Sequence, residues 1–124
     1  MDTRKKILLI DDDPRNIFAL TAVLKAKRYA CVSAASAAEG FGKLMTDHEI
    51  GIVLMDMMMP EMDGYAAIAH IRSEPALAAL PIVAVTAQAM QGDREKCLEA
   101  GANEYISKPI DAQKLLAIID KYTA

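Results

Sequence analysis

Short apolar runs alternate with longer stretches in which apolar residues recur every three or four positions. The apolar runs are too short for helices, and several are continuous, which is typical of strands covered on both faces. We expect strands at residues 7–10, 29–34, 51–56, 82–86 and 104–107. We expect helices at residues 14–24, 36–46, 64–74, 91–100 and 112–122. This order predicts an α/β fold, a doubly wound parallel five-stranded sheet with right-handed crossovers.

Residues with capping chemistry mark several of the expected helix ends. Asp13 directly precedes Pro14, which fits the first turn of a helix, so Asp13 is placed to cap free N–H groups. Ser36 is followed three residues later by Glu39, the spacing of a capping box. Gly101 follows the fourth helix as a C-terminal cap. These residues support the predicted helix boundaries.

Polar residues follow the apolar strands at their carboxyl ends. They are Asp11 and Asp12, Asp56, Thr86 and Lys108. In open parallel sheets the functional site lies beyond the carboxyl ends of the strands, near the point where the strand order reverses. We therefore expect these side chains to converge.

Three carboxylates at one edge of a sheet repel one another unless a cation lies between them. Magnesium, or manganese, is suited to such a place because it prefers carboxylates, waters and phosphate oxygens as ligands. The candidate ligands are Asp11, Asp12, Asp56 and the backbone carbonyl of Met58. The sequence thus predicts a divalent metal site.

The remaining polar residues at this edge suit phosphoryl chemistry. Lys108 offers a positive charge and Thr86 a hydroxyl group, and both can hold phosphoryl oxygens. An aspartate such as Asp56 can act as a nucleophile toward phosphorus and form an acyl phosphate. The candidate catalytic residues are therefore Asp56, Lys108 and Thr86.

Four segments together resemble the receiver domains of response regulators in two-component signalling. They are residues 6–14, 53–64, 83–87 and 105–109, which carry the acidic residues, Asp56, Thr86 and Lys108 in order. Each segment alone is a weak signal, whereas all four at these spacings are a strong one. The segment 87–101 is also similar to receivers of hybrid sensor histidine kinases.

The resemblance implies a role for each matching residue. Asp56 would be the phosphoacceptor, with magnesium held by Asp11 and Asp12. Lys108 would contact the phosphoryl group, and Thr86 with Tyr105 would form the conformational switch. The family also implies a flavodoxin-like strand order of 2-1-3-4-5 and a cis peptide bond between Lys108 and Pro109.

The same resemblance implies the partners. The phosphoryl group would come from a sensor histidine kinase or a histidine phosphotransfer protein in a two-component or phosphorelay system, and phosphorylation would change the binding of an unknown downstream protein. Such a domain catalyses only its own phosphorylation and dephosphorylation, so we do not expect an enzyme acting on other substrates.

Two details go beyond the resemblance. Either Asp11 and Asp12 or Asp12 and Asp13 could form the acidic pair, and the capping role of Asp13 favours the first pair. Met58 and Gln88 lie two residues after Asp56 and Thr86, so their side chains should flank an acyl phosphate. We hypothesise that the apolar Met58 side chain hinders an attacking water and prolongs the phosphorylated state.

Composition limits the alternatives. The 124 residues, 53% of them hydrophobic, fit one receiver domain over residues 1–124 with no output domain. A net charge of -3 with interspersed signs argues against nucleic acid or an anionic membrane as partner, and no apolar run has the length of a membrane span. Cys31 and Cys97 lie far apart without a metal-binding pattern, so we expect reduced thiols and a cytoplasmic protein.

Two other classes of protein share part of this pattern. The aspartates at residues 11–13 contain the D-x-D spacing of haloacid-type phosphohydrolases, but Arg15 stands where these enzymes have Thr or Val, and a cap domain is missing. A flavodoxin-like ligand-binding module would offer Ser, Thr or Gly and helix N–H groups to a phosphate in its first loop. Three aspartates in that loop would repel the phosphate.

Overall fold

Five strands alternate with five helices in the computed structural model, which describes residues 6–59, 63–86 and 92–123. The strands are β1 (Lys6–Ile10), β2 (Cys31–Ala34), β3 (Ile50–Asp56), β4 (Ile82–Thr86) and β5 (Glu104–Ser107). The helices are α1 (Pro14–Ala26), α2 (Ala37–Thr46), α3 (Gly64–Ser73), α4 (Asp93–Ala100) and α5 (Ala112–Thr123). A short 3-10 helix, η1 (Pro75–Leu77), precedes β4.

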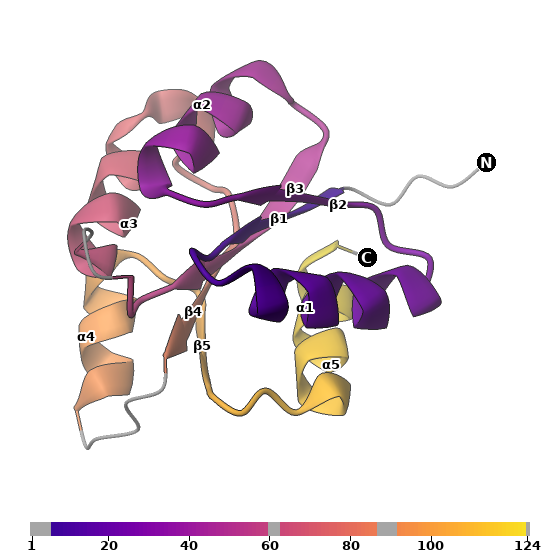
Figure 1. Ribbon diagram of the computed structural model, residues 1–124. Coiled ribbons are helices and arrows are strands. Elements are labelled where there is room, and N and C mark those ends of the chain that lie inside the picture. The colour runs from indigo at the N-terminus through magenta and orange to yellow at the C-terminus, as the bar shows by residue number, and fades with distance from the viewer. Residues whose placement is uncertain (1–5, 60–62, 87–91, 124) are drawn as a thin grey trace.

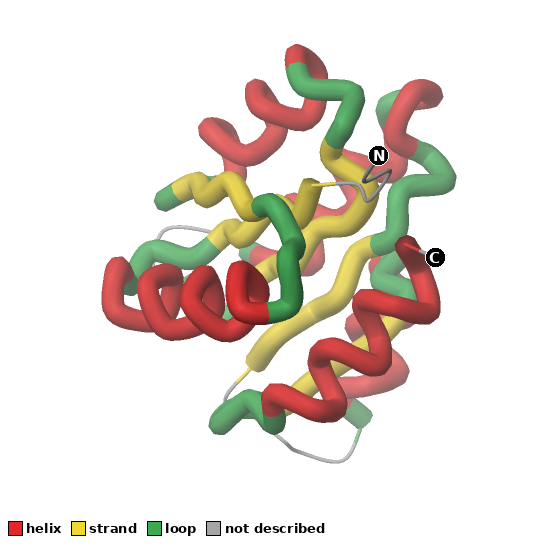
Figure 2. Tube along the Cα trace, turned by 90° about the vertical axis from the view of Figure 1, so that its right-hand side faces the viewer, coloured by secondary structure: helices red, strands yellow, loops and turns green. Residues whose placement is uncertain are grey.

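The sheet is parallel, with the strand order β2-β1-β3-β4-β5. Both predictions, the doubly wound architecture and the strand order, are confirmed. The order reverses at β1, which pairs with β2 on one side and with β3 on the other. Ile10 is level with Met55 across this pair, so the carboxyl ends of β1 and β3 lie side by side. Figure 2 shows the strands running together through the centre of the molecule.

Helices cover both faces of the sheet (Figure 1). Helices α1 and α5 pack on one face, where the core includes Ile52 and Leu54 of β3, and helices α2, α3 and α4 pack on the other, where it includes Val53 and Met55. Burial on both faces explains why the central strand is a continuous apolar run. None of the helices in the described part of the chain has the length and apolar character needed to cross a bilayer.

The structure differs from the sequence predictions mainly at element ends. The second strand begins at Cys31 rather than at Tyr29, because the Tyr29 N–H donates to the Leu24 carbonyl (3.0 Å) and closes the end of α1. The loop predicted between α3 and β4 contains η1. Gln91, the predicted start of the fourth helix, lies outside the described residues, and α4 is described from Asp93.

The predicted caps are confirmed. The Asp13 side chain accepts from the N–H of Arg15, and the Ser36 hydroxyl accepts from the N–H of Glu39 (3.1 Å). Gly101 ends α4 with a φ of 120°, a backbone conformation that disfavours other residues. A Cβ atom at Gly101 would also lie 2.8 Å from Cγ of Arg72. Glycine therefore permits both the turn and the approach of the arginine.

Arg72 joins α3 to the segment before β4 and to the segment between α4 and β5. Its Nε donates to the Gly101 carbonyl at 2.9 Å, and its Nη2 donates to Oδ1 of Asn103 at 2.7 Å. Its Nη1 lies within 3.2 Å of three further carbonyl oxygens, those of Leu77, Ala78 and Leu80. All of these acceptors are uncharged, and several belong to helix ends, where carbonyl groups favour a cation.

We predict that Arg72→Leu destabilises the fold, because several carbonyl groups lose a charged donor. The expected loss of unfolding free energy is about 2 kcal/mol, within the range for a hydrogen bond to a charged group. Urea unfolding followed by circular dichroism measures it. Arg94→Leu, at an exposed position on α4, is the matched control. Equal losses in both variants would contradict the role of Arg72.

Candidate functional site

Three aspartates meet at the carboxyl ends of β1 and β3. One carboxylate oxygen from each of Asp11, Asp12 and Asp56 lies within 4.8 Å of the others. Asp11 and Asp56 are only 6% and 4% exposed, whereas Asp12 is open to solvent. The neighbouring strand ends bring two of these residues together, and the turn after β1 adds the third. The predicted convergence of the three aspartates is confirmed.

The turn after β1 fixes the orientation of Asp11. Its Oδ1 accepts a hydrogen bond from the backbone N–H of Asp13 (2.8 Å), and its Oδ2 accepts one from Nδ2 of Asn16 (3.4 Å). The Asp13 side chain is turned away into its capping role and pairs with Arg15. The structure therefore places Asp11 and Asp12, rather than Asp12 and Asp13, beside Asp56.

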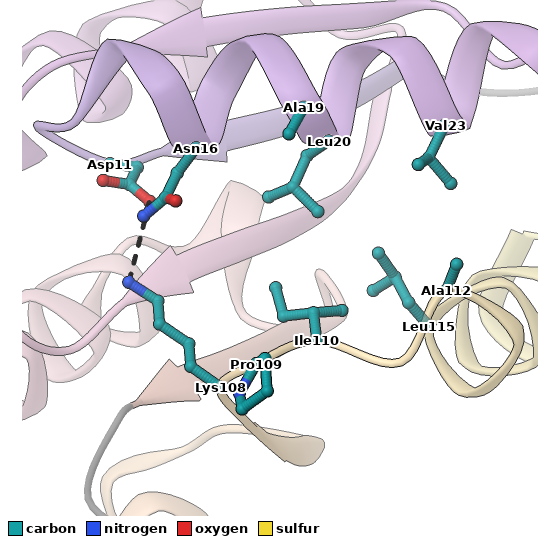
Figure 3. A pocket seen from close by; sticks show the side chains of 10 residues that line it. All are labelled: Asp11, Asn16, Ala19, Leu20, Val23, Lys108, Pro109, Ile110, Ala112 and Leu115. Carbon is teal, nitrogen blue, oxygen red and sulfur yellow. Dashed lines mark hydrogen bonds and ion pairs between the residues drawn. The ribbon is translucent and has the colours of Figure 1, made fainter.

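Lys108 reaches the aspartates from the segment after β5. Its Nζ lies 3.5 Å from Oδ1 of Asp56 and 4.0 Å from Oδ2 of Asp11. The backbone N–H of Lys108 donates to the Thr86 carbonyl at 2.8 Å, which ties the ends of β4 and β5. The expected cis bond between Lys108 and Pro109 is present. Figure 3 shows the lysine side chain extended across the opening toward Asp11.

Asp56 is held from its own side by the turn that follows β3. The backbone N–H of Met58 donates to Oδ1 of Asp56 at 2.9 Å. The Met58 side chain is a large apolar group that is 42% exposed. The local turn therefore places the residue two positions after Asp56 next to its carboxylate.

Thr86 and Tyr105 lie on neighbouring strands. Thr86 ends β4 and is buried, with 5% of its surface exposed. Tyr105, on β5, is half-buried and packs against the core on the α2, α3 and α4 side. Burial raises the pKa of Tyr105, and the nearby Asp93 and Cys97 of α4 raise it further. Gln88 lies outside the described residues.

The charges at this edge are unbalanced. Three carboxylates and the Lys108 ammonium group leave a local charge of -2 when all are ionised. The pKa of Asp11 is raised, mainly by burial and also by the negative charge of Asp56. The Asp13 N–H, the Lys108 charge and the Asn16 amide each lower this pKa, but they do not cancel the rise. A hard divalent cation among these oxygens would balance the charge, so the donor set fits magnesium.

Asn16 was not among the residues predicted from sequence. It lies on the first turn of α1, on the side that faces Asp11, and it lines a cavity of about 440 Å³ between α1 and the segment after β5 (Figure 3). Asp11 and Lys108 border one end of this cavity, and apolar side chains such as Leu20 and Leu115 border the rest. The available signal was a polar residue on the otherwise apolar face of the helix.

A doubly wound sheet with an acidic cluster and a lysine at its switch point is typical of α/β proteins that bind a ligand beyond the carboxyl ends of the strands. Residues 7–120 match the model of the response regulator receiver domain. The chain belongs to this family, as the four sequence segments predicted.

Similar proteins cover nearly the whole chain. The polar-differentiation response regulator DivK of Brucella ovis is 30% identical over 118 residues, which is 95% of each chain. The receiver domain of sensor histidine kinase PA1611 from Pseudomonas aeruginosa is 34% identical, with a TM-score of 0.86 and coverage of 96% of this chain and 97% of the other. That structure has a magnesium ion coordinated in its active site cleft.

A putative response regulator from Chloroflexus aurantiacus is 29% identical, with a TM-score of 0.89 and coverage of 96% of this chain and 97% of the other. The matches in sequence and in structure favour the receiver family over the phosphohydrolase and over the flavodoxin-like ligand-binding module.

We predict that Asp11→Asn stabilises the metal-free protein. A raised pKa in the folded state means that ionised Asp11 lowers stability at neutral pH, and this cost disappears as the pH falls through the raised pKa. The variant should therefore melt a few degrees higher than the parent at pH 7 in EDTA, and the difference should shrink in acid. Thermal unfolding measures both. Asp120→Asn, exposed on α5, should leave the melting temperature unchanged, and a variant that melts below the parent would contradict the prediction.

Proposed function

We propose that Asp56 accepts a phosphoryl group from a phosphohistidine on a sensor histidine kinase or a histidine phosphotransfer protein. The arrangement of Asp56 supports this most directly, because its carboxylate is buried at a strand end between the N–H of Met58 and the ammonium group of Lys108. These groups fix the nucleophile and leave it at the edge of the sheet, where a partner can approach.

The acidic cluster would hold the metal ion that such a transfer uses. Asp11, Asp12, Asp56 and the backbone carbonyl of Met58 are the proposed ligands of magnesium or manganese, because hard oxygen donors and a local charge of -2 fit a divalent cation. When bound, the ion neutralises negative charge on the phosphoryl oxygens. Mg²⁺ in the PA1611 receiver domain supports the same assignment here.

The residues of the chain would perform the transfer by position and charge. A carboxylate oxygen of Asp56 attacks phosphorus, the bond from phosphorus to the histidine nitrogen breaks, and the imidazole leaves with the electron pair. Lys108 is near enough to Asp56 for its ammonium group to contact a phosphoryl oxygen. Thr86, at the end of the adjacent strand, would donate a hydrogen bond from its hydroxyl group to another phosphoryl oxygen.

Thr86 and Tyr105 would carry the signal to the surface. Thr86 would move toward the phosphoryl group, and Tyr105 would turn inward beside it. The ring of Tyr105 already lies near the Asp93 and Cys97 positions of α4, so its movement would alter the face formed by α4, β5 and α5. This face would bind the downstream protein.

Within the receiver family, we assign the chain to the receivers of hybrid sensor kinases. It would act in the cytoplasm and catalyse only its own phosphorylation and dephosphorylation. The 34% identity to the receiver of a sensor histidine kinase supports the subtype, and the free thiols Cys31 and Cys97 are compatible with a reducing compartment. One receiver domain over residues 1–124 stays a prediction.

We predict that the protein, with magnesium, takes up one phosphoryl group from acetyl phosphate and that Asp56→Asn abolishes this uptake. An amide is a poor nucleophile and cannot form the acyl phosphate. Intact-mass spectrometry measures the uptake, and release by hydroxylamine identifies an acyl phosphate. Asp120→Asn is the matched control and should be labelled like the parent. Uptake that persists in Asp56→Asn but is lost in Asp11→Asn would contradict the assignment and favour a phosphohydrolase.

We also predict that Met58→Asn shortens the phosphorylated lifetime severalfold. The Met58 backbone N–H contacts the Asp56 carboxylate, and its exposed apolar side chain would hinder an attacking water, whereas an amide can hold and orient a water there. The rate of phosphate loss from isolated phosphorylated protein measures the effect. Met45→Asn is the control, because Met45 is similarly exposed (38%) but lies on α2. An unchanged rate in Met58→Asn would show that the Met58 side chain does not prolong the phosphorylated state.

A further inference from the structure

Asn16 is the polar side chain of α1 that contacts the acidic cluster directly. It is half-buried on the first turn of the helix, and its Nδ2 donates to Oδ2 of Asp11 at 3.4 Å. In Figure 3 the amide nitrogen points toward Asp11, while the rest of the same helix face carries Ala19, Leu20 and Val23. The amide therefore stands between the carboxylate and an apolar wall.

The start of α2 shows the usual role of the residue three positions after a helix N-cap. There the cap is Ser36, and the residue three positions on, Glu39, accepts a hydrogen bond from the N–H of Ala35 (3.0 Å). In α1 the cap is Asp13, and the corresponding residue is Asn16. Asn16 turns away from the helix end and bonds to Asp11 instead. An acidic residue at position 16 would add a fourth carboxylate to the cluster, whereas a neutral amide supplies a donor without charge.

The two hydrogen bonds of Asp11 fix the plane of its carboxylate. Oδ1 is held by the Asp13 N–H at 2.8 Å, and Oδ2 is held by Asn16 and faces Lys108 at 4.0 Å. The first bond comes from the backbone, so Asn16 is the neutral side chain that restrains the second oxygen. Without it, the carboxylate could rotate about its side-chain bonds toward the Lys108 ammonium group and away from Asp12 and Asp56.

We propose that Asn16 is a positioning residue for the metal site: it holds Asp11 in the orientation in which its carboxylate, with those of Asp12 and Asp56, binds Mg²⁺. This inference rests on the proposed metal role of the cluster. Groups that orient metal ligands from outside the coordination sphere commonly change metal affinity by about 10 to 100-fold when they are removed. The role belongs to the amide N–H, because a carboxylate only accepts hydrogen bonds.

The test compares magnesium binding by the parent and by Asn16→Leu. Leucine has a similar volume and faces a cavity with apolar walls, so the fold should tolerate it. Isothermal titration calorimetry with MgCl₂ alone should give a dissociation constant about tenfold weaker for the variant. Phosphorylation by acetyl phosphate should need correspondingly more Mg²⁺ for half-maximal rate, and the rate at saturating Mg²⁺ should approach that of the parent.

The control is Thr21→Leu, a polar to apolar change on the same helix that lines a different groove. It should leave the magnesium affinity unchanged. Asn16→Ala is the second variant, with the same expected weakening, if the leucine variant does not fold. If the parent protein binds Mg²⁺ no more tightly than the Asn16 variants do, the positioning role is overturned. Parent protein that binds no Mg²⁺ in calorimetry overturns the proposed metal site itself, so the two failures are distinguishable.

Discussion

Crowding of like charge at a buried edge of the sheet is the constraint on which the site depends. Asp11 and Asp56 are almost fully buried, and Asp12 lies within reach of both. Ionised carboxylates so placed lower the stability of the fold unless cations and donors surround them. Three neighbouring segments supply such groups, which are the Asp13 N–H, the Met58 N–H and the Lys108 ammonium group. Their convergence from separate segments makes the site a product of the whole sheet.

The strand order provides this convergence. Because β1 lies between β2 and β3, the chain leaves the ends of β1 and β3 toward opposite faces of the sheet, and an opening forms between the two departing segments. α1 and α5 cover one face and α2 to α4 the other, so the acidic cluster lies where both layers end. The apolar strands therefore serve the site as well as the core, since they fix the distances between groups that are remote in sequence.

The sequence was sufficient for the strands, the helices and their caps, because these rest on local chemistry, whereas the strand order came from the resemblance to receiver domains. Asp13 before Pro14 could be assigned to a cap, and this favoured Asp11 and Asp12 as the pair that the structure places beside Asp56. Other features depend on contacts between distant segments. The Arg72 guanidinium group donates to carbonyl groups of residues that follow residue 76. Asn16 contacts Asp11 only because the turn after β1 brings Asp11 close to α1. The polar position of Asn16 on an otherwise apolar helix face is visible in the sequence, but its contact with Asp11 is not.

The hydrogen bond between the Lys108 N–H and the Thr86 carbonyl links the segment that carries Lys108 to the end of β4. It holds the ends of β4 and β5 together, so the lysine that faces Asp56 and the threonine at the adjacent strand end share one backbone connection. Tyr105 lies three residues before Lys108 on β5 and packs toward α4. In the proposed function, a change of charge at Asp56 would act through Lys108 and along β5 on Tyr105. Such transmission would require the displacement of only a few side chains, because the strands themselves are fixed by the core.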